Sequence, residues 1–148
     1  MAKIEIESVP EKSGSRYPAP YGEACKARRF RRLGDAAGLK LLGATRCVLP
    51  PGAWSSQRHW HSKTDEFVVM LEGEMVLITD GGEEVMRPGD CAAFKAGEQN
   101  GHHAQNRSDK DAVFIALSTQ DPDDACDYPD IDLKVDATGY QHKDGTPY

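Results

Sequence analysis

The stretch HWHSKTDE, residues 59–66, decides what this chain can build. Alternate side chains of a β-strand share a face, so His59 and His61 would point the same way and could hold one metal ion. Glu66 follows across a short turn, where its carboxylate could supply a third bond. An isolated His-x-His pair is more often an ordinary surface or core feature. Evidence that this pair binds a metal must therefore come from the surrounding sequence.

A second histidine cluster lies further along the chain, in the stretch GHHAQN at residues 101–106. Either His102 or His103 could bring a third imidazole from a neighbouring strand. Three imidazoles and a carboxylate suit zinc, iron, manganese, nickel or cobalt better than calcium or magnesium.

Short apolar runs separated by turn residues surround the two histidine clusters. Residues 41–49, 75–79 and 112–117 have the composition of strands, and the Asp-Gly-Gly turn at residues 80–82 predicts a hairpin. Apolar periodicity of the helical kind does not extend over any useful length. Seven or eight short strands with turns between them predict an antiparallel sandwich or small barrel.

The two ends of the chain differ from this central part. We interpret residues 1–38 as an N-terminal arm, 39–119 as the barrel, and 120–148 as a C-terminal tail that packs on the barrel through its tyrosines. The arm contains five basic residues within positions 26–32. These could form a nuclear signal or a polyanion-binding patch, but a solvated segment anchored by Phe30 and Leu33 is the favoured interpretation because the chain as a whole is acidic.

Length and charge limit the possible functions. The chain has 148 residues, which suits one domain, and its net charge of −6 argues against nucleic acid or an anionic membrane as a partner. Its four cysteines are widely spaced and form no Cys-x-x-Cys pair. With no apolar leader or spanning segment in the sequence, we expect a cytoplasmic protein without disulfides.

The first histidine segment resembles the first motif of the cupin family, which has a glycine, a His-x-His pair, a glutamate and a closing glycine in order. The matching residues are Gly52, His59, His61, Glu66 and Gly73, with one extra residue between Gly52 and His59.

The second cluster resembles the second cupin motif. Gly97 and the His102-x-x-x-Asn106 spacing match, but Lys95 replaces the usual proline and the gap from glycine to histidine is longer. In this motif His102 shares a strand face with Asn106, while His103 points the other way. We therefore favour His102 over His103 as the third imidazole.

The resemblance covers residues 40 to 118 and implies an all-β fold, the antiparallel double-stranded β-helix or jelly-roll barrel of cupins. It also implies one divalent transition metal ion, such as zinc, manganese, iron or nickel. The implied ligands are His59, His61, Glu66 and His102.

More narrowly, the chain resembles small bacterial single-domain cupins labelled as sugar phosphate isomerases. That resemblance implies an enzyme that uses its metal as a Lewis acid on a small polar or oxygenated metabolite, in an isomerase or lyase reaction. Alternatives are a metal-dependent dioxygenase, a non-catalytic small-molecule-binding module, and a structural barrel with a vestigial histidine cluster. Fold alone does not choose among them.

Strand alternation also suggests which residues surround the ligand and which face outward. Gln57, Val68 and Met70 are predicted to share the inward face, and Gln57 or Asn106 could orient one of the imidazoles by accepting a hydrogen bond from it. The outward face of residues 67–71 is also apolar, so we expect a homodimer that covers it. The cations nearest the motifs, Arg58, Lys63 and Lys95, are interpreted as solvent-facing charges rather than phosphate contacts.

Overall fold

Short strands joined by tight turns build almost the whole molecule. The structure is a computed structural model and describes residues 3–148. Its helices are the 3-10 helices η1 (Ile6–Ser8) and η2 (Glu23–Cys25) and the α-helix α1 (Leu33–Ala36). Its strands are β1 (Lys12–Ser13), β2 (Arg29–Arg32), β3 (Leu42–Leu49), β4 (Trp60–His61), β5 (Glu66–Glu72), β6 (Met75–Thr79), β7 (Gly82–Met86), β8 (Cys91–Phe94), β9 (His103–Gln105), β10 (Ala112–Thr119), β11 (Cys126–Tyr128), β12 (Leu133–Asp136) and β13 (Gly139–Gln141).

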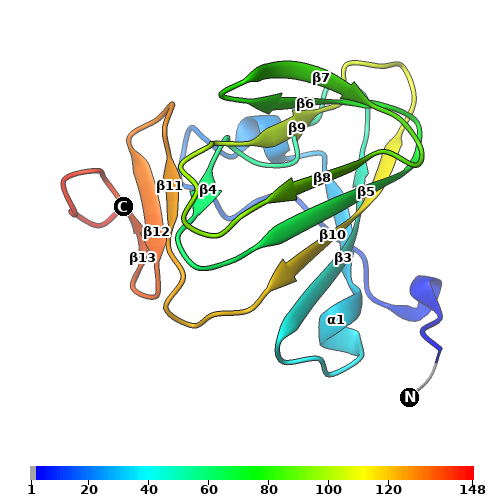
Figure 1. Cartoon of the computed structure of the whole chain (residues 1–148), viewed down its shortest axis with the longest axis horizontal. Helices are drawn as coiled ribbons and strands as arrows, with labels where there is room; N and C mark the ends of the chain where they lie inside the picture. Colours follow the sequence, from blue (N-terminus) through cyan, green and yellow to red (C-terminus); the bar gives the residue numbers. More distant parts are fainter. Residues whose placement is uncertain (1–2) are drawn as a thin grey trace.

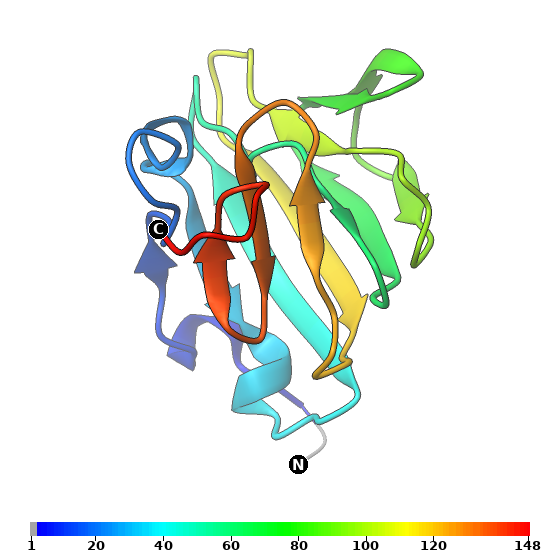
Figure 2. The same ribbon diagram turned by 90° about the vertical axis from the view of Figure 1, so that its left-hand side faces the viewer.

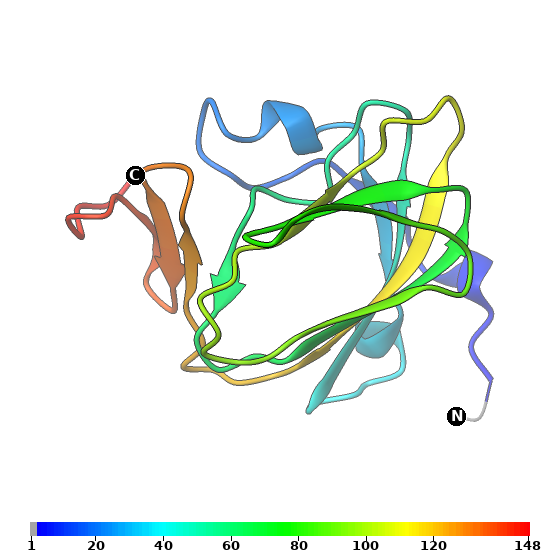
Figure 3. The same cartoon turned by 45° about the horizontal axis from the view of Figure 1, so that its top comes forward.

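The strands form three sheets, and every pairing is antiparallel. The largest has the order β1-β2-β3-β10-β5-β8, a second has the order β13-β12-β11-β4, and a third has the order β7-β6-β9. In Figure 1 the β7-β6-β9 sheet lies above the strands of the largest sheet, and Figure 3 looks into the barrel that the sheets enclose. The predicted all-β antiparallel barrel is confirmed.

The core fills the space between the largest sheet and the β7-β6-β9 sheet. Its main buried side chains are Leu49, Met70, Met75, Met86 and Phe114. Along β5 the exposed fraction alternates as a strand requires, from 41% at Phe67 to 1% at Met70 and 42% at Leu71. Two large apolar side chains are thus left exposed on the outer face of β5. The homodimer expected to cover them stays a prediction.

Both ends of the chain pair with strands of the central part. In the segment predicted as an arm, β2 pairs with β3 and places Phe30 opposite Cys47. In the segment predicted as a tail, β11 pairs with β4 and continues into β12 and β13. Figure 2 shows these C-terminal strands, in orange and red, beside the blue N-terminal segment. The domain boundaries at residues 38 and 119 stay predictions.

Gly73, which closes the first motif, has a steric role. Its φ is +69°, and a Cβ at this position would lie 2.3 Å from the carbonyl oxygen of Asp111. Only glycine accommodates both the left-handed backbone and this close approach. The residue therefore shapes the turn between β5 and β6.

Among residues 3–148, no helix is long and apolar enough to span a membrane.

Candidate metal centre

Three neighbouring segments bring the predicted ligands together. His61 lies in β4, and Glu66 is the first residue of β5. His59 and His102 face each other across an antiparallel bridge, in which the amide of each donates to the carbonyl of the other, at 3.2 and 2.9 Å. This pairing sets the two imidazole rings 5.0 Å apart. Backbone hydrogen bonding thus joins the two histidine clusters.

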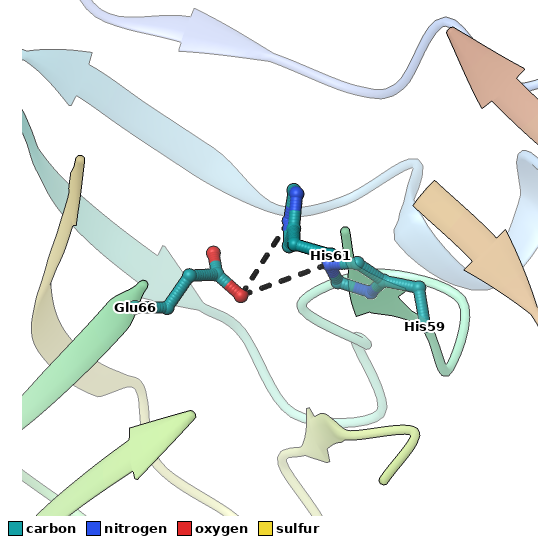
Figure 4. Close-up of side chains that lie close together, drawn as sticks. All are labelled: His59, His61 and Glu66. Carbon is teal, nitrogen blue, oxygen red and sulfur yellow. Dashed lines mark ion pairs between the residues drawn. The ribbon is translucent and has the colours of Figure 1, made fainter. Parts of the chain in front are cut away.

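The three imidazoles converge on one carboxylate oxygen. The Nε2 atoms of His102, His61 and His59 lie 2.7, 3.6 and 3.9 Å from Oε2 of Glu66. Figure 4 shows His59 and His61 directed at this carboxylate. An ion among these four groups would meet three nitrogens and one oxygen, a donor set that suits a transition metal.

The other nitrogen of each ring faces a hydrogen-bond acceptor. Nδ1 of His59 donates to the carbonyl of Gln57 at 2.8 Å, and Nδ1 of His102 donates to the carbonyl of Asn100 at 3.3 Å. Nδ1 of His61 donates to Oδ2 of Asp124 at 2.5 Å. For His59 and His61, a proton held on Nδ1 leaves the Nε2 lone pair free for a metal, and such outer hydrogen bonds are characteristic of metal-binding histidines. Nε2 of His102 is hydrogen-bonded to Glu66, and a bound ion would have to take the place of that contact.

Burial and mutual contacts also set the protonation states that metal binding requires. Burial lowers the pKa of His59 to about 4, so its ring is neutral at neutral pH. Burial alone would raise the pKa of Glu66, but the hydrogen bond from His102 and the charges of the neighbouring imidazoles lower it to about 2. A neutral imidazole and an ionised carboxylate are the forms that bind divalent metals.

His103 is directed away from this centre. Its Nδ1 donates to the carbonyl of Ser56 at 2.9 Å, and its ring packs edge-on against Trp54, with the ring centroids 4.8 Å apart. The ring of His102 instead stacks on Phe94, which holds the plane of the imidazole. The structure thus groups His102, rather than His103, with His59, His61 and Glu66.

Two further residues beside His61 come from the segment predicted as a tail. Asp124 and Cys126 form a second group of potential ligands with His61, all of their donor atoms lying within 4.8 Å of one another. Burial raises the pKa of the Cys126 thiol to about 12, so the thiol stays protonated, 3.2 Å from Nδ1 of His61. Sequence reasoning missed both residues. The only signal for Asp124 was an acidic run that follows the last barrel strand.

A cavity of about 490 Å³ adjoins the four predicted ligands. Val68 is among the residues that line it. Both chain ends contribute to its wall, through Tyr17 from the N-terminal segment and Tyr128 and Tyr140 from the C-terminal strands. The site therefore depends on segments that lie outside the central barrel.

The other three predicted pocket residues do not belong in the cavity wall. Met70 lies in the core, because alternation predicts which face of a strand it occupies but not how deep it lies. The side chain of Gln57 instead donates from Nε2 to the carbonyl of Tyr21 at 2.7 Å. Asn106 is 1% exposed and hydrogen-bonds to backbone carbonyls. Only the backbone of Gln57 serves an imidazole, through its bond to His59.

Replacing Asp124 with asparagine is expected to weaken metal binding about tenfold or more, because an outer carboxylate orients His61 and raises its basicity. Burial would raise the pKa of Asp124, but its bonds from His61 and from the amide of Lys63 lower it, so the charge is present at neutral pH. Competition with a chromogenic chelator measures the change. Asp123→Asn alters an exposed neighbouring acid whose carboxylate pairs with Lys63, and serves as the control. Equal affinities for both variants would show that Asp124 has no part in metal binding.

The sequence model of the cupin domain matches residues 45–118. The chain belongs to the cupin family. A cupin-superfamily sugar phosphate isomerase from Silicibacter pomeroyi is 45% identical to this cupin. Its crystal structure superposes with a TM-score of 0.93, and the match covers 99% of this chain and 96% of that one.

More distant structures share the fold alone. The polyketide cyclase RemF from Streptomyces resistomycificus is 18% identical with a TM-score of 0.63, over 80% of this cupin and 79% of that chain. A predicted oxalate decarboxylase from Thermotoga maritima is 22% identical with a TM-score of 0.62, over 79% of this cupin and 97% of that chain. None of the curated proteins matches significantly.

Proposed function

We propose that this cupin is a metal-dependent isomerase of a small, polar, oxygenated metabolite of the sugar phosphate class. The observation that carries the proposal is the convergence of three Nε2 atoms on the Glu66 carboxylate beside a cavity of about 490 Å³. His59, His61, Glu66 and His102 would hold one zinc, manganese, iron or nickel ion. When bound, such an ion supplies Lewis-acid polarisation of a carbonyl or hydroxyl oxygen.

The remaining cavity wall suits an oxygen-rich ligand. Burial raises the pKa of both Tyr17 and Tyr128, so these phenols stay protonated and can donate hydrogen bonds to ligand oxygens. Their rings meet edge to face with centroids 5.6 Å apart. Since they come from opposite ends of the chain, both ends would contact the ligand.

The similarity to the Silicibacter pomeroyi isomerase supports this assignment because of its extent. It covers 99% of the chain, including the N-terminal and C-terminal segments that line the cavity and lie outside residues 45–118. A shared barrel alone would leave these segments unmatched. The match therefore extends over the chain segments that line the pocket as well as over the barrel.

Reconstitution of activity tests the proposal. The protein is stripped of metal with a chelator, reloaded separately with manganese, iron, nickel or zinc, and incubated with aldose and ketose phosphates. NMR spectroscopy should detect interconversion in at least one reloaded form, none in the stripped protein, and a loss of about 100-fold or more in Glu66→Gln. Stoichiometric metal without turnover of any sugar phosphate would overturn the isomerase assignment. If the iron-loaded protein consumes oxygen and the other reloaded forms do not, the dioxygenase alternative is favoured.

A further inference from the structure

The basic run at residues 26–32 is divided between two faces by β2. Arg29 and Arg31 point to the outer face, where they pair with Asp111 and Glu7, each at 2.8 Å. Arg28 and Arg32 instead line the cavity that adjoins the metal centre. Because successive side chains of an extended segment face opposite ways, part of this basic run faces the ligand pocket and the rest faces outward.

Arg28 is held rigidly in the cavity wall. Its Nε donates to the carbonyl of Gly14 at 2.9 Å, and its Nη1 donates to the carbonyl of Ser55. The residue is half-buried, and within residues 3–148 it forms no ion pair with a carboxylate. Burying a cation without a counter-ion is unfavourable. Such a cation suits a site whose negative partner arrives with the ligand.

The charge of the whole cavity wall supports the same conclusion. Arg16, Arg28 and Arg32 line it, whereas Glu66 is the one acidic residue in the lining, although the chain carries a net charge of −6. Arg16 and Arg32 are exposed. Arg32 has a carboxylate partner, Asp35, at 3.6 Å.

The cations next to the histidine motifs are less suited to this role. Arg58 is already paired with both Asp80 and Asp130. Lys63 pairs with Asp123 at 3.6 Å. Neither of them, nor Lys95, lines the cavity, whereas Arg16, Arg28 and Arg32 do.

We propose that Arg28, assisted by Arg16 and Arg32, binds the anionic group of the ligand, a phosphate or a carboxylate. A guanidinium offers several N–H donors in a fixed plane, which matches the oxygens of such a group. The role of this anion site in catalysis rests on the proposed function, but its binding of an anion does not. The segment before the matched cupin domain would then determine substrate class.

Calorimetric titration of the metal-free full chain with inorganic phosphate, and separately with acetate, tests this proposal. Phosphate binding is expected to weaken about tenfold or more in Arg28→Gln, which removes a charge-assisted contact. The matched control is Arg29→Gln, which removes the same charge from the neighbouring residue, the first of β2, whose side chain points to the outer face, and should leave binding unchanged. Binding of acetate in place of phosphate would assign the site to carboxylates.

A second variant covers the case in which Arg28→Gln does not fold, since Arg28 also ties together Gly14 and Ser55. The double change Arg16→Ser, Arg32→Ser affects exposed side chains and should weaken anion binding several-fold. Unaltered binding in both variants, or no binding of either anion to metal-free protein, would overturn the proposal. Anion binding that depends on Arg28, in a protein that isomerises no sugar phosphate, would preserve the anion site while rejecting the proposed function.

Discussion

Alanine at both His59 and His61 is expected to abolish stoichiometric metal binding. The two rings supply two of the three Nε2 atoms around Glu66, and each is already oriented by a hydrogen bond at Nδ1. Loss of an outer hydrogen bond alone lowers metal affinity about 10–100-fold, so loss of two direct ligands should exceed that range. Elemental analysis of untagged protein after dialysis measures the effect, expected to fall from one ion per chain to a trace.

Two single changes at other histidines serve as controls. His142→Gln alters a ring that pairs with Asp132 and stacks on Tyr148 in the C-terminal segment, so it should leave the metal content intact. His103→Gln removes the neighbouring imidazole that faces Ser56, and it too should retain one ion. An unchanged metal content in the double variant would reject the proposed centre. Loss of metal in His103→Gln would show that His103 was wrongly excluded in favour of His102.

Local strand geometry was enough to predict much of this site. The one-residue spacing of His59 and His61 places both rings on one face of a strand, wherever that strand lies in the barrel. Strand alternation likewise placed Val68 and Met70 on the inward face of residues 67–71, although it did not show that Met70 lies in the core rather than in the cavity wall. Predictions of this kind succeed because they depend only on neighbours in sequence.

Contacts between distant segments could not be derived in this way. Asp124 is 63 residues from the His61 ring that it orients, and nothing in an acidic run specifies that partner. Arg28 was grouped with a solvated charge cluster because residues 29–32 were not recognised as a strand, and only strand alternation separates its cavity face from its outer face. The N-terminal and C-terminal segments line the pocket because they pack against the barrel. Their polar composition alone does not predict this packing.

Asn106 illustrates a residue of the second motif whose predicted role was wrong. Its Nδ2 donates to the carbonyls of Leu49 and Lys110 at 2.6 and 2.7 Å, and its Oδ1 accepts from the amide and hydroxyl of Ser108 at 2.9 and 2.8 Å. The side chain thus closes the loop between β9 and β10 and ties it to the end of β3. Its spacing from His102 reflects this structural task rather than contact with a ligand.

Asn106→Ala is therefore expected to destabilise the fold by about 1–3 kcal/mol, because it removes the side-chain donor to the buried carbonyl of Leu49, and an unsatisfied buried polar group costs about that much. Urea denaturation followed by circular dichroism measures this loss, while the fraction that stays folded should still bind one metal ion. Ser108→Ala removes a partly exposed hydroxyl from the same network and should cost less than about 1 kcal/mol. Wild-type stability in Asn106→Ala, combined with weaker metal or phosphate binding, would contradict this account and return Asn106 to the binding site. A loss of stability without a loss of binding would place it in the framework that holds the β9–β10 loop beside His102.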